Sequence, residues 1–157
     1  MLKYQKILIN LVISLTIMVV ANWWIPSPAL AITQEIRFDT TAGYVVKTIF
    51  SYDEAQNPQK IKEYGQGKTE TIDSLKVSFY KPSGELIADY DNIVDGMATG
   101  NYFEFGFDPV AQRIYGNIDI GGESAGEMYL KGKAESELSL IEVTELGEEK
   151  AIDRVSP

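Results

Sequence analysis

Four oxygen-bearing side chains between residues 89 and 95 are the part of this sequence best suited to bind a metal ion. Asp89, Asp91, Asn92 and Asp95 lie close together where a predicted strand ends. Calcium is held by several carboxylate and carbonyl oxygens, so this segment is a candidate calcium site. It departs from the EF-hand loop, which needs an Asp or Asn at the fifth position and a Glu at the twelfth. Asp and Asn also stabilise turns through hydrogen bonds to their own backbone, and that is the competing interpretation.

Two further acids, Glu104 and Asp119, fall on successive predicted strands that can pair as a hairpin. Glycoside hydrolysis uses two carboxyl groups about 5–10 Å apart, so the two residues are a candidate pair for that reaction. Both alternate with apolar neighbours, which predicts solvated side chains on an outer face. The chain has 23 acidic residues, so a chance pairing competes with a catalytic role.

Histidine and cysteine do not occur in the sequence. Their absence excludes a Ser-His-Asp triad, a cysteine nucleophile, a His/Cys zinc site and an axial haem histidine. It also excludes disulfide bonds and a lipid-modified cysteine. We therefore expect a protein that is not an enzyme, with a hydrolase built on Glu104 and Asp119 as the alternative.

Tyrosines on the predicted strands form a candidate ligand face. They are Tyr80, Tyr90, Tyr102, Tyr115 and Tyr129. Several alternate with the apolar residues, and exposed aromatic rings can stack on sugars. Half-exposed tyrosine is also common on ordinary β surfaces. The pattern predicts a carbohydrate-binding face as one possible function.

Apolar and polar residues alternate along most of the chain after residue 31, which is the period of half-buried strands. The clearest strand covers residues 102–107, where Phe103, Phe105 and Phe107 share one face. Turn signals separate about eight such segments. We predict an all-β fold, either an antiparallel β-sandwich or a small barrel. Residues 53–68 are predicted to form a long loop.

The first 31 residues differ in kind from the rest. A basic start precedes an apolar run over residues 7–21, and Ala29 and Ala31 supply a small-x-small end. This order is typical of a secretory signal peptide cleaved after Ala31. A retained membrane anchor is the alternative, because the apolar stretch continues through Trp23 and Trp24 to about the 20 residues of a membrane span. The predicted domains are a signal peptide (1–31), a β domain (32–144) and a charged, flexible tail (145–157).

The chain is acidic, with a formal net charge of −9. Removal of the predicted signal peptide takes away two lysines and no acid, so the charge becomes −11. This charge disfavours nucleic acids and anionic lipid surfaces. Membrane contact is expected only if the leader is retained. The expected compartments are the periplasm, the extracellular medium or a thylakoid lumen.

Several short segments follow one another in a recognisable order. They are Phe-Ser-Tyr-Asp at 50–53, Gly-x-Gly at 65–67, Ile-Asp-Ser-Leu-Lys-Val-Ser-Phe at 72–79, Phe-x-Phe-x-Phe-Asp at 103–108 and Ile-Tyr-Gly at 114–116. Residues 36–140 thereby resemble the secreted β-sandwich region of bacterial PEP-CTERM-type surface proteins, including cyanobacterial ones. The resemblance implies a β-sandwich without defined catalytic residues. Residues 151–157 do not match the Pro-Glu-Pro sorting signal of that family, so anchoring by its route is not implied.

These patterns predict an exported, non-enzymatic β-sandwich that acts as a surface, envelope or lumenal interaction protein. Its expected partner is an envelope or extracellular protein or a glycan. The alternative is a binding module for carbohydrate or calcium, which would use the tyrosine face or the segment from Asp89 to Asp95.

Overall fold

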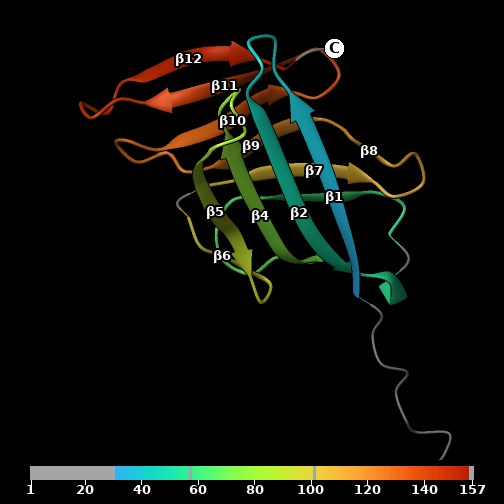
Figure 1. Ribbon diagram of the computed structural model, residues 1–157. Coiled ribbons are helices and arrows are strands. Elements are labelled where there is room, and N and C mark those ends of the chain that lie inside the picture. Colours follow the sequence, from blue (N-terminus) through green and yellow to red (C-terminus); the bar gives the residue numbers. More distant parts are fainter. Residues whose placement is uncertain (1–30, 57, 101, 156–157) are drawn as a thin grey trace, which may run out of the picture.

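The computed structural model describes residues 31–56, 58–100 and 102–155, and this part of the chain is almost entirely β-structure (Figure 1). The strands are β1 (Ala31–Asp39), β2 (Val45–Asp53), β3 (Ile61–Tyr64), β4 (Ile72–Tyr80), β5 (Leu86–Val94), β6 (Met97–Ala98), β7 (Glu104–Asp108), β8 (Arg113–Ile114), β9 (Asn117–Gly121), β10 (Met128–Lys133), β11 (Glu137–Val143) and β12 (Glu149–Arg154). A short 3-10 helix, η1, covers Glu54–Gln56. No helix with the length and apolar character of a membrane span occurs in these described residues.

The strands form two antiparallel sheets, which confirms the predicted β-sandwich. The first sheet has the order β1-β2-β4-β5-β6, and the second has the order β12-β11-β10-β9-β7-β3, with β8 paired to β7. The chain crosses between the sheets after β2, after β3 and again after β6. Figure 1 shows that the strands of the second sheet run across those of the first instead of alongside them.

The core lies between the sheets and is built from the inward residues of each alternating strand. Phe50 of β2 is fully buried, and its ring centroid is 4.9 Å from those of Phe105 and Phe107. Both contacts are edge-to-face, a favoured geometry for aromatic pairs. The predicted row of phenylalanines is therefore confirmed, because Phe103, Phe105 and Phe107 are all buried in this core.

The segment predicted to be a long loop, residues 53–68, contains η1 and the four-residue strand β3. Ile61 and the buried acid Glu63 point inward, while Lys62 and Tyr64 point outward. The Glu63 carboxylate accepts hydrogen bonds from the backbone amides of Glu70 and Thr71, so this inward acid closes the following turn. A strand of four residues is difficult to predict from sequence, because alternation over so few residues gives only two apolar positions.

The predicted flexible tail is also different in the structure. Residues 149–154 form β12, which pairs with β11 through a register shift at Leu140 and Ile141. The Asp153 carboxylate accepts hydrogen bonds from the Thr41 hydroxyl, at 2.5 Å, and from the Ala42 amide, at 2.8 Å. These bonds connect the last strand to the β1–β2 turn. The prediction of a flexible tail is therefore wrong for residues 149–154. A segment rich in charged residues can still form an edge strand, because most of its side chains stay exposed to solvent.

The predicted signal peptide lies outside the described residues, except for Ala31. Ala31 is the first residue of β1 and pairs with Asp53 of β2.

Candidate functional site

A row of polar and aromatic side chains crosses the outer face of the second sheet. Tyr64 of β3 is opposite Glu104 of β7, Glu104 is opposite Asp119 of β9, and Asp119 is opposite Lys131 of β10. Residues directly opposite each other in an antiparallel sheet point to the same face. These four side chains therefore stand next to one another on the surface that faces away from the core.

Each acid of this row has a lysine partner. Lys62 Nζ lies 3.4 Å from Glu104 Oε1, and Lys131 Nζ lies 3.2 Å from Asp119 Oδ2. The prediction that strands carrying Glu104 and Asp119 pair is confirmed. The prediction that both are solvated is wrong for Asp119, which is only 7% exposed.

The loop after β9 brings a further acid to Asp119. The Glu123 carboxyl lies close enough to Asp119 for the two groups to influence each other's pKa. Burial raises the pKa of Asp119, even though Lys131 opposes this shift. Burial and then the nearby Asp119 charge raise the pKa of Glu123. The two carboxyls thus sit where a negative charge is costly and a cation or a proton is favoured.

Tyr129 lies on the same face of the second sheet as Asp119, and its side chain is fully buried. It is two residues before Lys131 on the same face of β10, and Lys131 Nζ lies 5.4 Å from its ring centroid. Its hydroxyl forms no hydrogen bond of good geometry with the described residues. Burial, followed by the neighbouring Glu149 carboxylate of β12, raises its pKa. The prediction that Tyr129 belongs to an exposed ligand face is therefore wrong.

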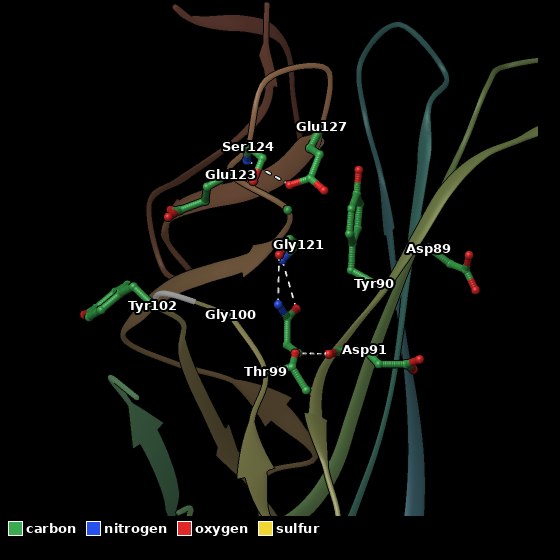
Figure 2. Close-up of a pocket in the computed structure, with 12 residues that line it drawn as sticks. Asp89, Tyr90, Asp91, Thr99, Gly100, Tyr102, Gly121, Glu123, Ser124 and Glu127 are labelled. Atoms are coloured by element: carbon green, nitrogen blue, oxygen red, sulfur yellow. Dashed lines mark hydrogen bonds between the residues drawn. The ribbon is translucent and has the colours of Figure 1, made fainter. Parts of the chain in front are cut away.

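Two hollows adjoin on this side of the molecule. One, which we call the Asp119 hollow, has a volume of about 700 Å³ and is lined by Tyr102, Glu104, Asn117, Ile118, Asp119, Glu123, Lys131, Gly132, Lys133 and Glu149. The other, the Asn92 hollow, has a volume of about 440 Å³ and is lined by Asp89, Tyr90, Asp91, Asn92, Thr99, Gly100, Tyr102, Gly121, Gly122, Glu123, Ser124 and Glu127 (Figure 2). Tyr102 and Glu123 line both hollows, so the two lie next to each other.

The residues of the predicted calcium site have separate structural roles. Asn92 is buried, and its amide group donates to the Gly121 carbonyl at 2.8 Å and accepts from the Gly121 amide at 2.9 Å. Asp89 forms an ion pair with Lys76, and Figure 2 shows that the Asp89 and Asp91 side chains point away from Gly121, the hydrogen-bond partner of Asn92.

Asp95, the fourth residue of that prediction, occupies the tight β5–β6 turn with Gly96. Both residues have positive φ, 49° and 70°, as expected for a two-residue hairpin turn made by Asp-Gly. The structure does not bring the four residues together as a ligand set. Within the described residues, no three acidic side chains are arranged to hold a metal ion.

The remaining tyrosines of the predicted ligand face lie in different places. Tyr80 is on the first sheet, where Lys47 Nζ lies 5.4 Å from its ring centroid. Tyr90 packs edge-to-face on Phe79 in the core, and its hydroxyl accepts from the Met128 amide. Tyr80 therefore lies apart from Tyr102, whereas half-buried Tyr90 and Tyr102 both line the Asn92 hollow.

Tyr115 follows β8, and Lys60 Nζ lies 5.0 Å from its ring centroid. Only Tyr102 of the five predicted tyrosines therefore lines the Asp119 hollow, with 43% of its surface exposed. Tyr64, which sequence reasoning missed, is 67% exposed at the end of the acidic row. The alternation over residues 61–64 was its only signal in the sequence.

Comparison with protein-family models, with curated protein sequences and with solved structures found no match.

The side chains that line these two hollows can form hydrogen bonds to a small molecule. Carboxyl oxygens can accept hydrogen bonds from hydroxyl or amine groups, and lysines can donate hydrogen bonds to hydroxyl groups. The two exposed tyrosine rings add apolar faces beside them. The site thus combines hydrogen-bonding groups at its centre with aromatic surface at its rim.

Proposed function

We propose that this chain is an exported, non-enzymatic binding module that holds a glycan on the outer face of its second sheet. The observation that carries this proposal is the cross-strand row Tyr64–Glu104–Asp119–Lys131, with Tyr102 beside it. A sugar presents hydroxyl groups around its edge and C–H groups on its faces. The row offers charged hydrogen-bonding partners for the former and exposed tyrosine rings for the latter.

The arrangement of the acids favours binding over hydrolysis. Glu104 and Asp119 each form an ion pair with a lysine, at 3.4 Å and 3.2 Å. A general acid or a nucleophile must face the glycosidic bond directly, whereas each of these carboxyl groups faces a lysine. We therefore assign these residues to ligand contact.

Export is supported by the order of basic, apolar and small residues in the first 31 positions. We propose the periplasm, the extracellular medium or a thylakoid lumen as the compartment and an envelope or extracellular glycan as the partner. The acidic net charge of −9 favours neutral or basic glycans over anionic ones.

Calorimetric titration of the purified protein with a panel of neutral and amino oligosaccharides tests the proposal. Tyr102→Ala and Tyr64→Ala should each weaken binding of a recognised glycan about tenfold, the loss of about 1.4 kcal/mol that one aromatic contact supplies. Tyr80→Ala is the matched control, because Tyr80 lies on the other sheet. Binding to no member of the panel, or equal loss in the control, would overturn the proposal.

A further inference from the structure

We infer that the outer edge of β1 pairs with β1 of a second copy of this chain, so that two molecules form a symmetric dimer through their first sheets. The proposed glycan face belongs to the second sheet, so the two surfaces are separate. Three features of β1 support the pairing: a long unpaired edge, a self-complementary order of charges and half-buried apolar residues beside a hollow.

β1 is the outermost strand of the first sheet (Figure 1), and no other described strand pairs with the outer edge of its nine residues. Its pairing with β2 is regular throughout, without a bulge. The other edges are short or irregular, because β6 and β8 have two residues each, β3 has four and the pairing of β12 contains a register shift. A long, regular edge exposes backbone donors and acceptors that can pair with another strand.

The odd-numbered residues of β1 turn their backbone groups to this edge. The Thr40 amide donates to the Tyr44 carbonyl within the β1–β2 hairpin, at 2.9 Å. The next amide, that of Thr41, points the opposite way and donates to the Arg154 carbonyl, also at 2.9 Å. Hydrogen-bonded positions alternate along an antiparallel strand, so the even-numbered residues bond to β2 and the odd-numbered residues face outward.

The charges of β1 select one register for the antiparallel pairing of two identical strands. Only a register that places odd-numbered residues opposite each other can form the hydrogen bonds. When Ile36 is opposite Ile36 of the second copy, exposed Glu35 is opposite exposed Arg37 on both sides of the symmetry axis. The neighbouring registers, centred on Glu35 or on Arg37, place like charges opposite each other, which destabilises a sheet.

The inner face of β1 carries apolar surface in the same register. Ile32 and Ile36 pack against the core but are only half-buried. A hollow of about 450 Å³ lies beside them, and its lining includes Ile36 and Phe38 of β1 and Ile114 of β8. Ile36 of the second copy would lie on the same face, directly opposite Ile36, and would cover this surface. The pairing therefore removes apolar area from water while it completes the backbone hydrogen bonds.

Sedimentation velocity of the purified protein between about 1 and 200 µM tests the pairing, because an interface of one strand pair is small and its dimer is expected to be reversible. Arg37→Glu and Glu35→Arg should each weaken the dimer about tenfold or more, since each places two pairs of like charges across the contact. The double variant Glu35→Arg/Arg37→Glu restores opposite charges and should recover the dimer. The two single changes shift the net charge in opposite directions, so a general charge effect cannot explain a loss in both.

Lys68→Glu is the matched control, because it changes the net charge as Arg37→Glu does and Lys68 pairs with Met97 of β6, at the opposite edge of the first sheet. It should leave the dimer unchanged. Residue-resolved amide hydrogen exchange gives a second readout, in which the Glu35 and Arg37 amides become protected as the concentration rises. A protein that stays monomeric over the whole range would overturn the inference. A dimer that survives both single changes would assign the contact to another surface and overturn it as well.

Discussion

Asp119 lies on the outer face of a sheet and is nevertheless almost completely buried. Its cross-strand neighbours Glu104 and Lys131 cover it on two sides, and Glu123 reaches it from the loop after β9. Burial is the largest influence on its pKa and raises it, because a carboxylate loses hydration there. Alternation predicts an exposed side chain at this position, whereas in the structure the Asp119 carboxyl is buried and its pKa is raised.

The raised pKa of Asp119 sets the sign of a pH dependence. A carboxyl whose folded pKa is above its unfolded value, near 4, stabilises the fold fully below that value. This contribution is lost as the pH rises through the folded pKa. Asp119→Asn removes the ionisable group, so we expect a higher melting temperature than wild type at pH 7. The advantage should shrink as the pH falls toward 4.

Calorimetric melting curves from pH 4 to pH 7.5 measure this difference. Asp73→Asn, which changes an exposed acid on β4, controls for the loss of one negative charge. A melting temperature below that of wild type at pH 7, with a deficit that disappears as the pH falls, would show that the Lys131 ion pair outweighs desolvation.

At the scale of elements, β12 is a charged segment that pairs with β11 as an edge strand of the second sheet. Only two of its six residues, Ile152 and Asp153, are even half-buried. Asp153 joins this edge strand to the β1–β2 turn, at the far end of the chain. Burial acts against its charge, but hydrogen bonds from Thr41 and from two backbone amides outweigh burial and lower its pKa to about 2.

Asp153→Asn should destabilise the fold at pH 7, because an amide nitrogen would face the Ala42 amide that Asp153 accepts from. We expect a loss of about 1–2 kcal/mol in urea unfolding, the scale of partly screened bonds to a charged group. The depressed pKa means that this contribution is complete above pH 4 and lost as the pH falls toward 2. The wild-type advantage should therefore disappear in strong acid. A loss that is independent of pH would contradict an ionic role for Asp153.

At the scale of the whole molecule, Asn92 connects the two sheets. It lies on β5, near the edge of the first sheet, and its amide group pairs with both backbone groups of Gly121 at the end of β9 (Figure 2). A side chain on Gly121 would collide with β10, since a Cβ there would lie 2.5 Å from the Met128 carbonyl oxygen. Both residues of this contact line the Asn92 hollow, so the contact also fixes the shape of that hollow.

Asn92→Asp tests that connection with a side chain of the same shape. Asp has no N–H to give to the Gly121 carbonyl and would place an unpaired charge in a buried position. We expect a loss of about 2–3 kcal/mol in urea unfolding at pH 7. Asn117→Asp, an exposed change on β9, is the control. If Asn92→Asp proves no more destabilising than this control, the connection does not stabilise the sandwich.

The sequence by itself determined the layers of this fold. Alternation with period two names the inward rows, such as Phe103, Phe105 and Phe107, because a strand shows successive side chains to opposite faces. The same rule predicted that Glu104 and Asp119 lie together on the outer face. These are local properties of a strand and its nearest turn, so they can be derived from neighbouring residues.

Only the tertiary structure decided how exposed each outward residue is and which distant residues it meets. Tyr129 is covered by residues of its own strand and by Glu149, twenty positions along the chain. Asn92 resembles a metal ligand in the sequence but bonds to Gly121, and β12 is held by a turn more than a hundred residues away. Long-range pairing depends on the geometry of the whole fold, and alternation carries no information about it.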